Sequence, residues 1–177
     1  YAGAAALGAD LRYPTDDAPQ IYGYPLRDPS QVSRLSLPDR YLETKAMRPF
    51  VEIQRWMQSR AGGERRVSIG TGIEGPVTTA KLLRGQDFFL DLYENPGAAH
   101  RLLDLVTESY IRFSREAREY NGAPLDRGGC GIADDFAGLI APAMWPKFVA
   151  PYYRRIYEAF GEGPRGQHSE LLRPGHL

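Results

Sequence analysis

The alternation of apolar and polar positions predicts a chain in which long helices follow short strands. The clearest helix covers residues 95–121, where Asn95 and Pro96 suit the first turn and apolar side chains recur every three to four residues. A second helical region covers 142–160, and Pro151 should break or kink it. Shorter helices are predicted at 38–46, 49–60, 77–84 and 87–93.

Four short segments between these helices have strand character: 10–13, 67–71, 129–134 and 164–168. Strands that alternate with helices are typical of a parallel sheet built from βα units rather than from hairpins. The sequence contains no internal repeat or linker, so one continuous domain over residues 1–177 is expected. In such sheets the reactive groups lie at the carboxyl ends of the strands.

The amino-acid composition excludes some classes of binding partner. The 22 Lys and Arg residues balance the 22 Asp and Glu residues, so no net charge attracts nucleic acid or an acidic membrane surface. No apolar run approaches the roughly 20 residues of a membrane helix. The single cysteine, Cys130, is expected to be buried in a strand and unreactive, and the absence of a charged-then-apolar leader favours the cytoplasm. Because the chain begins with Tyr1 and stops directly after the fourth predicted strand, we expect a fragment of a longer protein.

Polar residues follow three neighbouring predicted strands. Glu74, Thr78 and Thr79 follow the second strand, Asp134 and Asp135 the third, and His168 and Glu170 the fourth. If Asp134 and Asp135 still lie in the strand, they point to opposite sides, so one faces the mouth of the sheet while the other binds backbone amides. The alternative is that both aspartates only cap the next turn.

His168 and Glu170 are two residues apart, so at a strand end both can face the same way and offer a nitrogen and an oxygen to one metal ion. A third ligand would have to come from His176 or from sequence beyond Leu177. The alternative is a histidine hydrogen-bonded in a turn, with the glutamate in solvent. His100 lies on the predicted solvent face of a helix and receives no role.

Other polar and aromatic residues are candidates for substrate contacts. We expect Glu74, Thr78 and Tyr152 to bind substrate, although the residues alone do not decide which of Tyr152 and Tyr153 is core and which lines the mouth. The glycines before Pro76 match neither the nucleotide loop nor the dinucleotide fingerprint, which excludes nucleotide binding and leaves close backbone approach to a bulky ligand.

Several stretches together resemble the uroporphyrinogen decarboxylase family, which includes cobalamin-linked methyltransferases. They are "ALGADLRYPTDDAPQIYGYPLRDPSQVSRL", "GIEGPVTTAKLLRG", "YENPGAAHRLLDLVTESY" and "IADDFAGLIAPAMWPKFVAPYYRRIYEAFG". Their common order and spacing, from about Ala6 to Leu177, carry the resemblance. It implies an α/β fold, a (β/α)8 TIM-type barrel that is incomplete in this chain, with the site in its mouth.

The resemblance assigns roles by position. Asp134 matches the aspartate of the family's Asp-Ser-Trp-Ala-Gly motif, and Asp135 stands where the decarboxylase has serine, so both are candidate catalytic residues. A second carboxylate at Asp135 would repel the acidic arms of a porphyrinogen. The methyltransferase branch carries His-x-Cys as zinc ligands, and the matching residues here are His168 and Glu170, with glutamate in place of cysteine.

Three functions follow from the resemblance. The preferred interpretation is zinc-assisted methyl transfer from a methyl-corrinoid to a thiol or similar acceptor, with a corrinoid protein as a candidate partner. The alternative is cofactor-free decarboxylation of a porphyrinogen in haem synthesis. The third is a barrel without turnover that binds a tetrapyrrole or a partner subunit. Incomplete barrels expose apolar edges, so a second copy of the chain is also a candidate partner.

Overall fold

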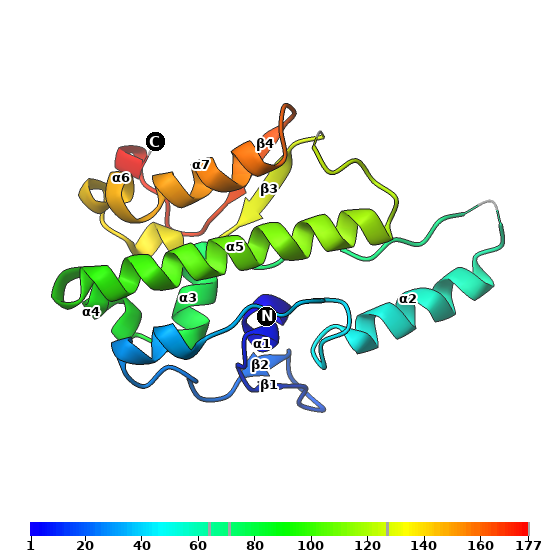
Figure 1. The fold of residues 1–177 in the computed structure, drawn as a ribbon, viewed down its shortest axis with the longest axis horizontal. Helices are drawn as coiled ribbons and strands as arrows, with labels where there is room; N and C mark the ends of the chain where they lie inside the picture. The colour runs from blue at the N-terminus through cyan, green and yellow to red at the C-terminus, as the bar shows by residue number, and fades with distance from the viewer. Residues whose placement is uncertain (64, 71, 127, 177) are drawn as a thin grey trace.

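The computed structural model describes residues 1–63, 65–70, 72–126 and 128–176. The long helix α5 (Pro96–Tyr120) runs through the middle of the molecule. Helices α3 (Pro76–Arg84), α4 (Asp87–Glu94) and α7 (Ala150–Ala159) pack against it, while α2 (Arg48–Arg60) extends away from the other helices (Figure 1). In the described part of the chain, no helix combines the length and apolar character needed to cross a membrane.

Helix α5 confirms the strongest periodicity in the sequence. Its buried apolar side chains are Leu102, Leu103, Val106, Tyr110, Ile111, Phe113 and Ala117, together with Ala98 and Ala99 near its start. These positions share one face because an α-helix has 3.6 residues per turn. Helices α2, α3 and α4 also form within a residue of their predicted bounds.

The predicted helix 142–160 is divided into three pieces: a 3₁₀ turn (Pro142–Met144), α6 (Trp145–Phe148) and α7. The break falls at Val149, whose φ of −126° is not helical, rather than at Pro151. Pro151 instead lies in the first turn of α7, where a proline costs no hydrogen bond.

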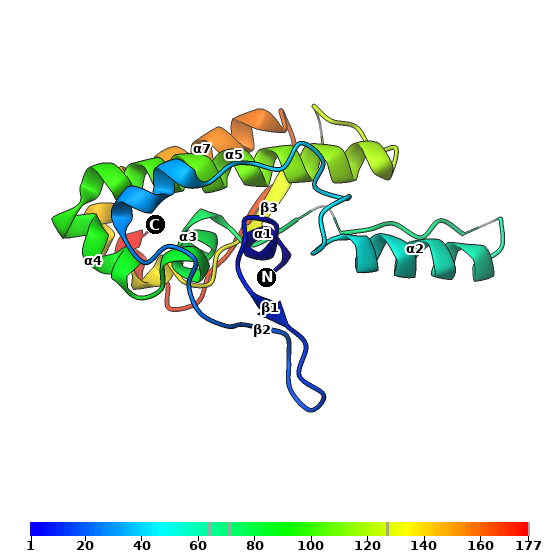
Figure 2. The ribbon, with the colours of Figure 1, turned by 60° about the horizontal axis from the view of Figure 1, so that its bottom comes forward.

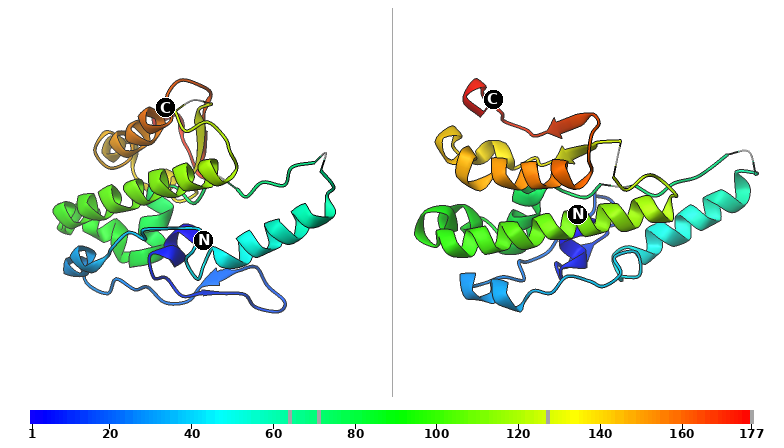
Figure 3. Two further views of the ribbon diagram at one scale, coloured as in Figure 1. Left: turned by 45° about the vertical axis from the view of Figure 1, so that its right-hand side comes forward. Right: turned by 45° about the horizontal axis from the view of Figure 1, so that its top comes forward.

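Strands β3 (Cys130–Ala133) and β4 (Arg165–His168) pair in parallel, with Ala133 opposite His168 (Figure 3). Glu74 forms an isolated parallel bridge with Ala133 on the other side of β3. Three chain segments therefore run in the same direction, as the βα pattern predicts. The described strands form two separate two-stranded sheets and close no barrel.

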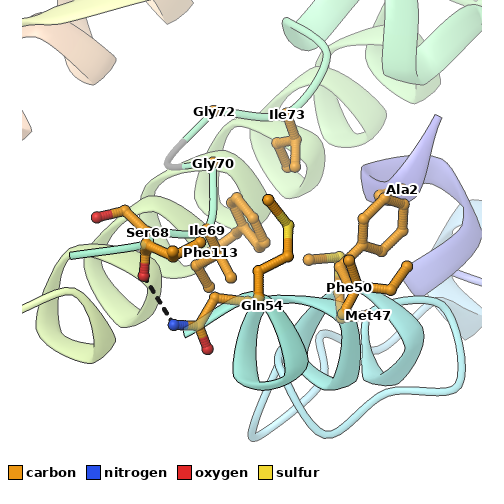
Figure 4. Close-up of a pocket in the computed structure, with 13 residues that line it drawn as sticks. Ala2, Met47, Phe50, Gln54, Ser68, Ile69, Gly70, Gly72, Ile73 and Phe113 are labelled. Carbon is orange, nitrogen blue, oxygen red and sulfur yellow. Dashed lines mark hydrogen bonds between the residues drawn. The ribbon is translucent and has the colours of Figure 1, made fainter. Parts of the chain in front are cut away.

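The predicted strand 67–71 is absent from the described residues, and Thr71 lies outside them. Side-chain amides make the backbone hydrogen bonds that a neighbouring strand would otherwise make in this segment. The Asn121 amide accepts from the Ile69 N–H and donates to its carbonyl, and Gln54 donates to the Val67 carbonyl (Figure 4). The backbone is thus extended and hydrogen-bonded without belonging to a sheet.

The amino-terminal predictions are partly wrong. The segment 10–13 was expected in the parallel sheet, but β1 (Leu11–Arg12) pairs antiparallel with β2 (Gln20–Ile21) in a hairpin that projects from the molecule (Figure 2). Residues 38–46 form turns rather than a helix, because the Glu116 carboxylate of α5 accepts from two backbone N–H groups there. Two short elements were not predicted: α1 (Ala2–Ala6) and a 3₁₀ helix (Pro29–Arg34).

A buried ion pair joins the end of α3 to α4. Arg84 in α3 lies 2.8 Å from the Asp91 carboxylate of α4, and both side chains are more than nine-tenths buried. The same guanidinium donates to the Arg27 carbonyl and so holds the preceding loop against these helices. The Asp87 carboxylate also lies 3.1 Å from Arg84 but is 60% exposed, so loss of Asp91 would leave the buried charge of Arg84 only partly compensated.

Candidate functional site

A carboxylate and an imidazole meet at the carboxyl ends of β3 and β4. The Asp135 Oδ1 atom lies 3.5 Å from His168 Nε2, and the two side chains are 48% and 71% exposed. At this distance the contact is an ion pair when His168 is protonated rather than a short hydrogen bond. The sequence predicts that the acids after β3 and the residues His168 to Glu170 converge on one shared cavity; the structure shows the contact between Asp135 and His168, and the shared cavity stays a prediction.

Asp134 points the opposite way and is completely buried. Its carboxylate accepts hydrogen bonds from the Val77 N–H at 3.0 Å, the Thr78 N–H at 2.6 Å and the Tyr153 hydroxyl at 3.0 Å. It therefore caps the amino terminus of α3 from another element, since Gly75 has no side chain to cap it. Asp134 binds backbone amides while Asp135 faces solvent, which is the division of roles expected for adjacent strand residues.

Burial dominates the electrostatics of this cap. Loss of water raises the pKa of Asp134 to about 6, although the hydrogen bonds from Thr78, Val77 and Tyr153 act in the opposite direction. Burial also raises the pKa of the Tyr153 hydroxyl, which keeps it a neutral donor to the carboxylate. The close packing requires a glycine at position 75, because a Cβ atom there would lie 2.5 Å from the Asp134 Cβ.

The residues expected to bind substrate make internal contacts instead. Thr78 is 1% exposed, and the Glu74 carboxylate accepts from the Gly3 N–H at 3.3 Å. Tyr152 is 5% exposed, and its hydroxyl lies 2.6 Å from His100 Nδ1, between α7 and α5. A substrate role for these three residues stays a prediction, with their polar atoms already engaged.

Two further expectations about aromatic and histidine residues are wrong. His100 is not solvent-facing but partly buried, and its ring stacks on Phe148 with centroids 4.7 Å apart. Neither Tyr152 nor Tyr153 lines a mouth, because both are 5% exposed. The sequence did not predict the contact of Tyr153, which lies in α7 and donates its hydroxyl hydrogen to the Asp134 carboxylate.

The donors for a metal ion do not come together. Among the residues that the structure describes, no three histidine, cysteine, aspartate or glutamate side chains form a group that could hold one. Both ring nitrogens of His176 are engaged, Nδ1 with the Arg173 N–H and Nε2 with the Ile140 carbonyl. Glu170 lies exposed beyond β4. The described residues therefore do not complete a zinc site, and zinc at His168 and Glu170 stays a prediction.

Cys130 offers no alternative nucleophile. It is only partly buried at the start of β3, and burial raises the pKa of its thiol, so the reactive thiolate is disfavoured. The candidate chemistry thus lies with Asp135 and His168.

A model of the family described as uroporphyrinogen decarboxylase (URO-D) matches residues 2–169. The chain belongs to the uroporphyrinogen decarboxylase family. A uroporphyrinogen decarboxylase of Bordetella pertussis is 26% identical over 94% of this chain and 45% of its own length. One from Syntrophotalea carbinolica is 29% identical over 90% of this chain and 48% of its own. The chain thus spans less than half the length of these relatives.

A solved structure agrees with this assignment at the level of the fold. A methyltransferase from Methanosarcina mazei superposes with a TM-score of 0.73 and 22% identity, over 94% of this chain and 48% of that one. The chain therefore has part of the TIM-barrel-like architecture of the uroporphyrinogen decarboxylase family, and family membership supports an enzyme. Membership alone leaves methyl transfer and decarboxylation unresolved.

An apolar pocket of about 410 Å³ lies between α2, residues 67–70 and 72–73, and Phe113 of α5 (Figure 4). Side chains such as Met47, Phe50 and Ile73 line it, and Gln54 and Ser68 supply its polar atoms. No titratable side chain belongs to its described lining, and it shares no residue with the Asp135 and His168 pair. It can bury apolar surface but offers no acid or base for the chemistry of this family.

Proposed function

We propose that this chain is part of an enzyme that transfers a methyl group to a thiol or a similar neutral acceptor, with Asp135 and His168 as its acid–base pair. The observation that supports this proposal is the exposed carboxylate beside an exposed imidazole at the carboxyl edge of two parallel strands. Reactive groups in parallel α/β sheets lie at this edge.

The geometry suits proton removal from an acceptor. Asp135 faces His168 Nε2, so the contact favours a proton on Nε2 and leaves Nδ1 as the basic nitrogen. As the thiol sulfur attacks the methyl carbon, its proton passes to Nδ1. The new sulfur–carbon bond forms while the bond between methyl and donor breaks, and that electron pair leaves with the donor. The charge of Asp135 stabilises the imidazolium.

The Asp135 carboxylate also affects which substrates can bind. Asp135 occupies the place of a serine in the decarboxylases, and a second negative charge there repels the carboxylate arms of a porphyrinogen. A neutral acceptor meets no such repulsion. A methyl-corrinoid donor, carried by a corrinoid protein, belongs to this proposal through the family resemblance. Zinc at His168 and Glu170 is a separate prediction from the same resemblance, because an imidazolium with protons on both ring nitrogens has none left to bind a metal ion.

Purified protein incubated with methylcobalamin and 2-mercaptoethanol tests the proposal, with the S-methyl product measured by mass spectrometry. We expect His168→Ala and Asp135→Asn each to lower the rate by about 100-fold, as for loss of a general base. Glu162→Gln, which changes an exposed carboxylate before β4 that has no role in the site, is the matched control and should retain wild-type activity. Absence of S-methyl product from the wild type, or full activity of His168→Ala, would contradict the proposal.

Decarboxylation is the second candidate, because the similar proteins from Bordetella and Syntrophotalea are named uroporphyrinogen decarboxylases. In that case the protein should release carbon dioxide from uroporphyrinogen with a chelator present. Asp135→Ser, which restores the serine of the family motif, should then increase the release. If neither product forms, binding without turnover is the candidate function that remains.

A further inference from the structure

The first turn of α3 contacts the chain on both sides of Asp135. The Thr78 N–H donates to the Asp134 carboxylate at 2.6 Å, and the Phe136 N–H donates to the Thr78 hydroxyl oxygen at 3.2 Å. Thr78 therefore binds the residue before Asp135 and the residue after it.

The same segment is joined to His168 through the backbone. The Asp134 N–H donates to the His168 carbonyl at 2.8 Å, at the end of the β3–β4 pairing. The chain before Asp135 is thus tied to β4, and the chain after it is tied to α3. Because the Asp135 side chain itself is half exposed, its place beside His168 depends on these backbone anchors.

We infer that Thr78 is a positioning residue, whose hydroxyl holds Phe136 and so keeps the Asp135 carboxylate within reach of His168. The inference rests on the proposed function, which places this pair at the reacting atoms. Thr78 is 1% exposed, so the inferred role acts through the backbone at Phe136 and requires no contact between Thr78 and substrate. Its effect is geometric: without the bond to Phe136 the backbone after Asp135 is free to rotate, and the carboxylate moves relative to the imidazole.

Two substitutions separate the hydroxyl from the shape of the side chain. Thr78→Val keeps the branched shape and the backbone N–H bond to Asp134 but removes the hydroxyl, which accepts from the Phe136 N–H and also favours the ionised Asp134 carboxylate. Thr78→Ser keeps the acceptor. Thr107→Val is the matched control, since Thr107 is equally buried, lies in α5, and its hydroxyl has no hydrogen-bond partner among the described residues.

We expect Thr78→Val to lower kcat for methyl transfer by about 10-fold while KM stays within about twofold, because misplaced reacting groups slow the chemical step more than binding. Thr78→Ser should retain at least about half of the wild-type kcat, and Thr107→Val should match the wild type. Equal losses in the valine and serine variants would overturn the inference, because the hydroxyl would then not be the cause.

Amide hydrogen exchange gives a readout that does not need turnover. The Phe136 amide should exchange about 10-fold faster in Thr78→Val than in the wild type, and at the wild-type rate in Thr78→Ser. An unchanged Phe136 exchange rate in Thr78→Val would overturn the inference. If the wild type transfers no methyl group, the proposed function fails, while the exchange rates still decide whether Thr78 fixes this segment.

Discussion

The buried carboxylate of Asp134 gives the sharpest test of the structure, because two opposing effects act on it. Burial raises its pKa from an ordinary value of 3.8 to about 6, while three hydrogen-bond donors favour the ionised form. If burial has the larger effect, then between pH 3.8 and about pH 6 the folded protein holds a proton on Asp134 that the unfolded chain does not hold. Stability then falls as the pH rises through this range.

The magnitude follows from the shift. A difference of about two pH units, at about 1.36 kcal/mol per unit, amounts to about 3 kcal/mol. Asp134→Asn removes the titration and keeps the size of the side chain. The free energy of unfolding of the wild type minus that of Asp134→Asn should therefore decrease by about 3 kcal/mol from about pH 4 to about pH 6.5 and stay constant above.

Urea unfolding at a series of pH values measures this difference. Asp135→Asn serves as the control, since its half-exposed carboxylate should change the stability by less than about 0.5 kcal/mol. A difference that grows with pH would refute the reasoning. It would mean that the hydrogen bonds from α3 and Tyr153 outweigh burial and that the pKa of Asp134 is lowered by folding.

Three further substitutions test the packing, each measured by urea unfolding. Gly75→Ala should cost more than about 2 kcal/mol, because the new Cβ atom would overlap the capping carboxylate; a neutral result would place that cap elsewhere. Asn121→Ala should cost about 1–3 kcal/mol and speed amide exchange at Ile69. Unchanged exchange would contradict the hydrogen bonds between the Asn121 side chain and the Ile69 backbone. Asp91→Ala should cost less than the about 3–5 kcal/mol of a fully unpaired buried charge, because Asp87 still pairs with Arg84. Replacing Asp91 and Arg84 together by leucine and methionine should cost less again, and equal costs would argue against a buried charge as the cause.

Local chemistry in the sequence was enough to predict most helices and the direction of the sheet. The periodicity of residues 95–121 is a property of neighbouring positions on one helix, so α5 forms where the pattern places it. Asp134 and Asp135 have the two different roles that were expected, although β3 ends at Ala133 and strand alternation is therefore not the cause. The βα alternation correctly predicted that β3 and β4 run in parallel.

Contacts between distant segments decided the rest. From their spacing, His168 and Glu170 were expected to face the same way and bind one metal ion. In the folded protein the His168 side chain contacts Asp135, which follows the adjacent strand β3. Likewise, only the packing of α7 brings the Tyr153 hydroxyl to Asp134, and only α5 supplies the carboxylate that holds residues 41 and 42 in turns. Residue spacing specifies which side chains share a face of one element, but which two elements lie side by side depends on how the whole chain buries its apolar surface.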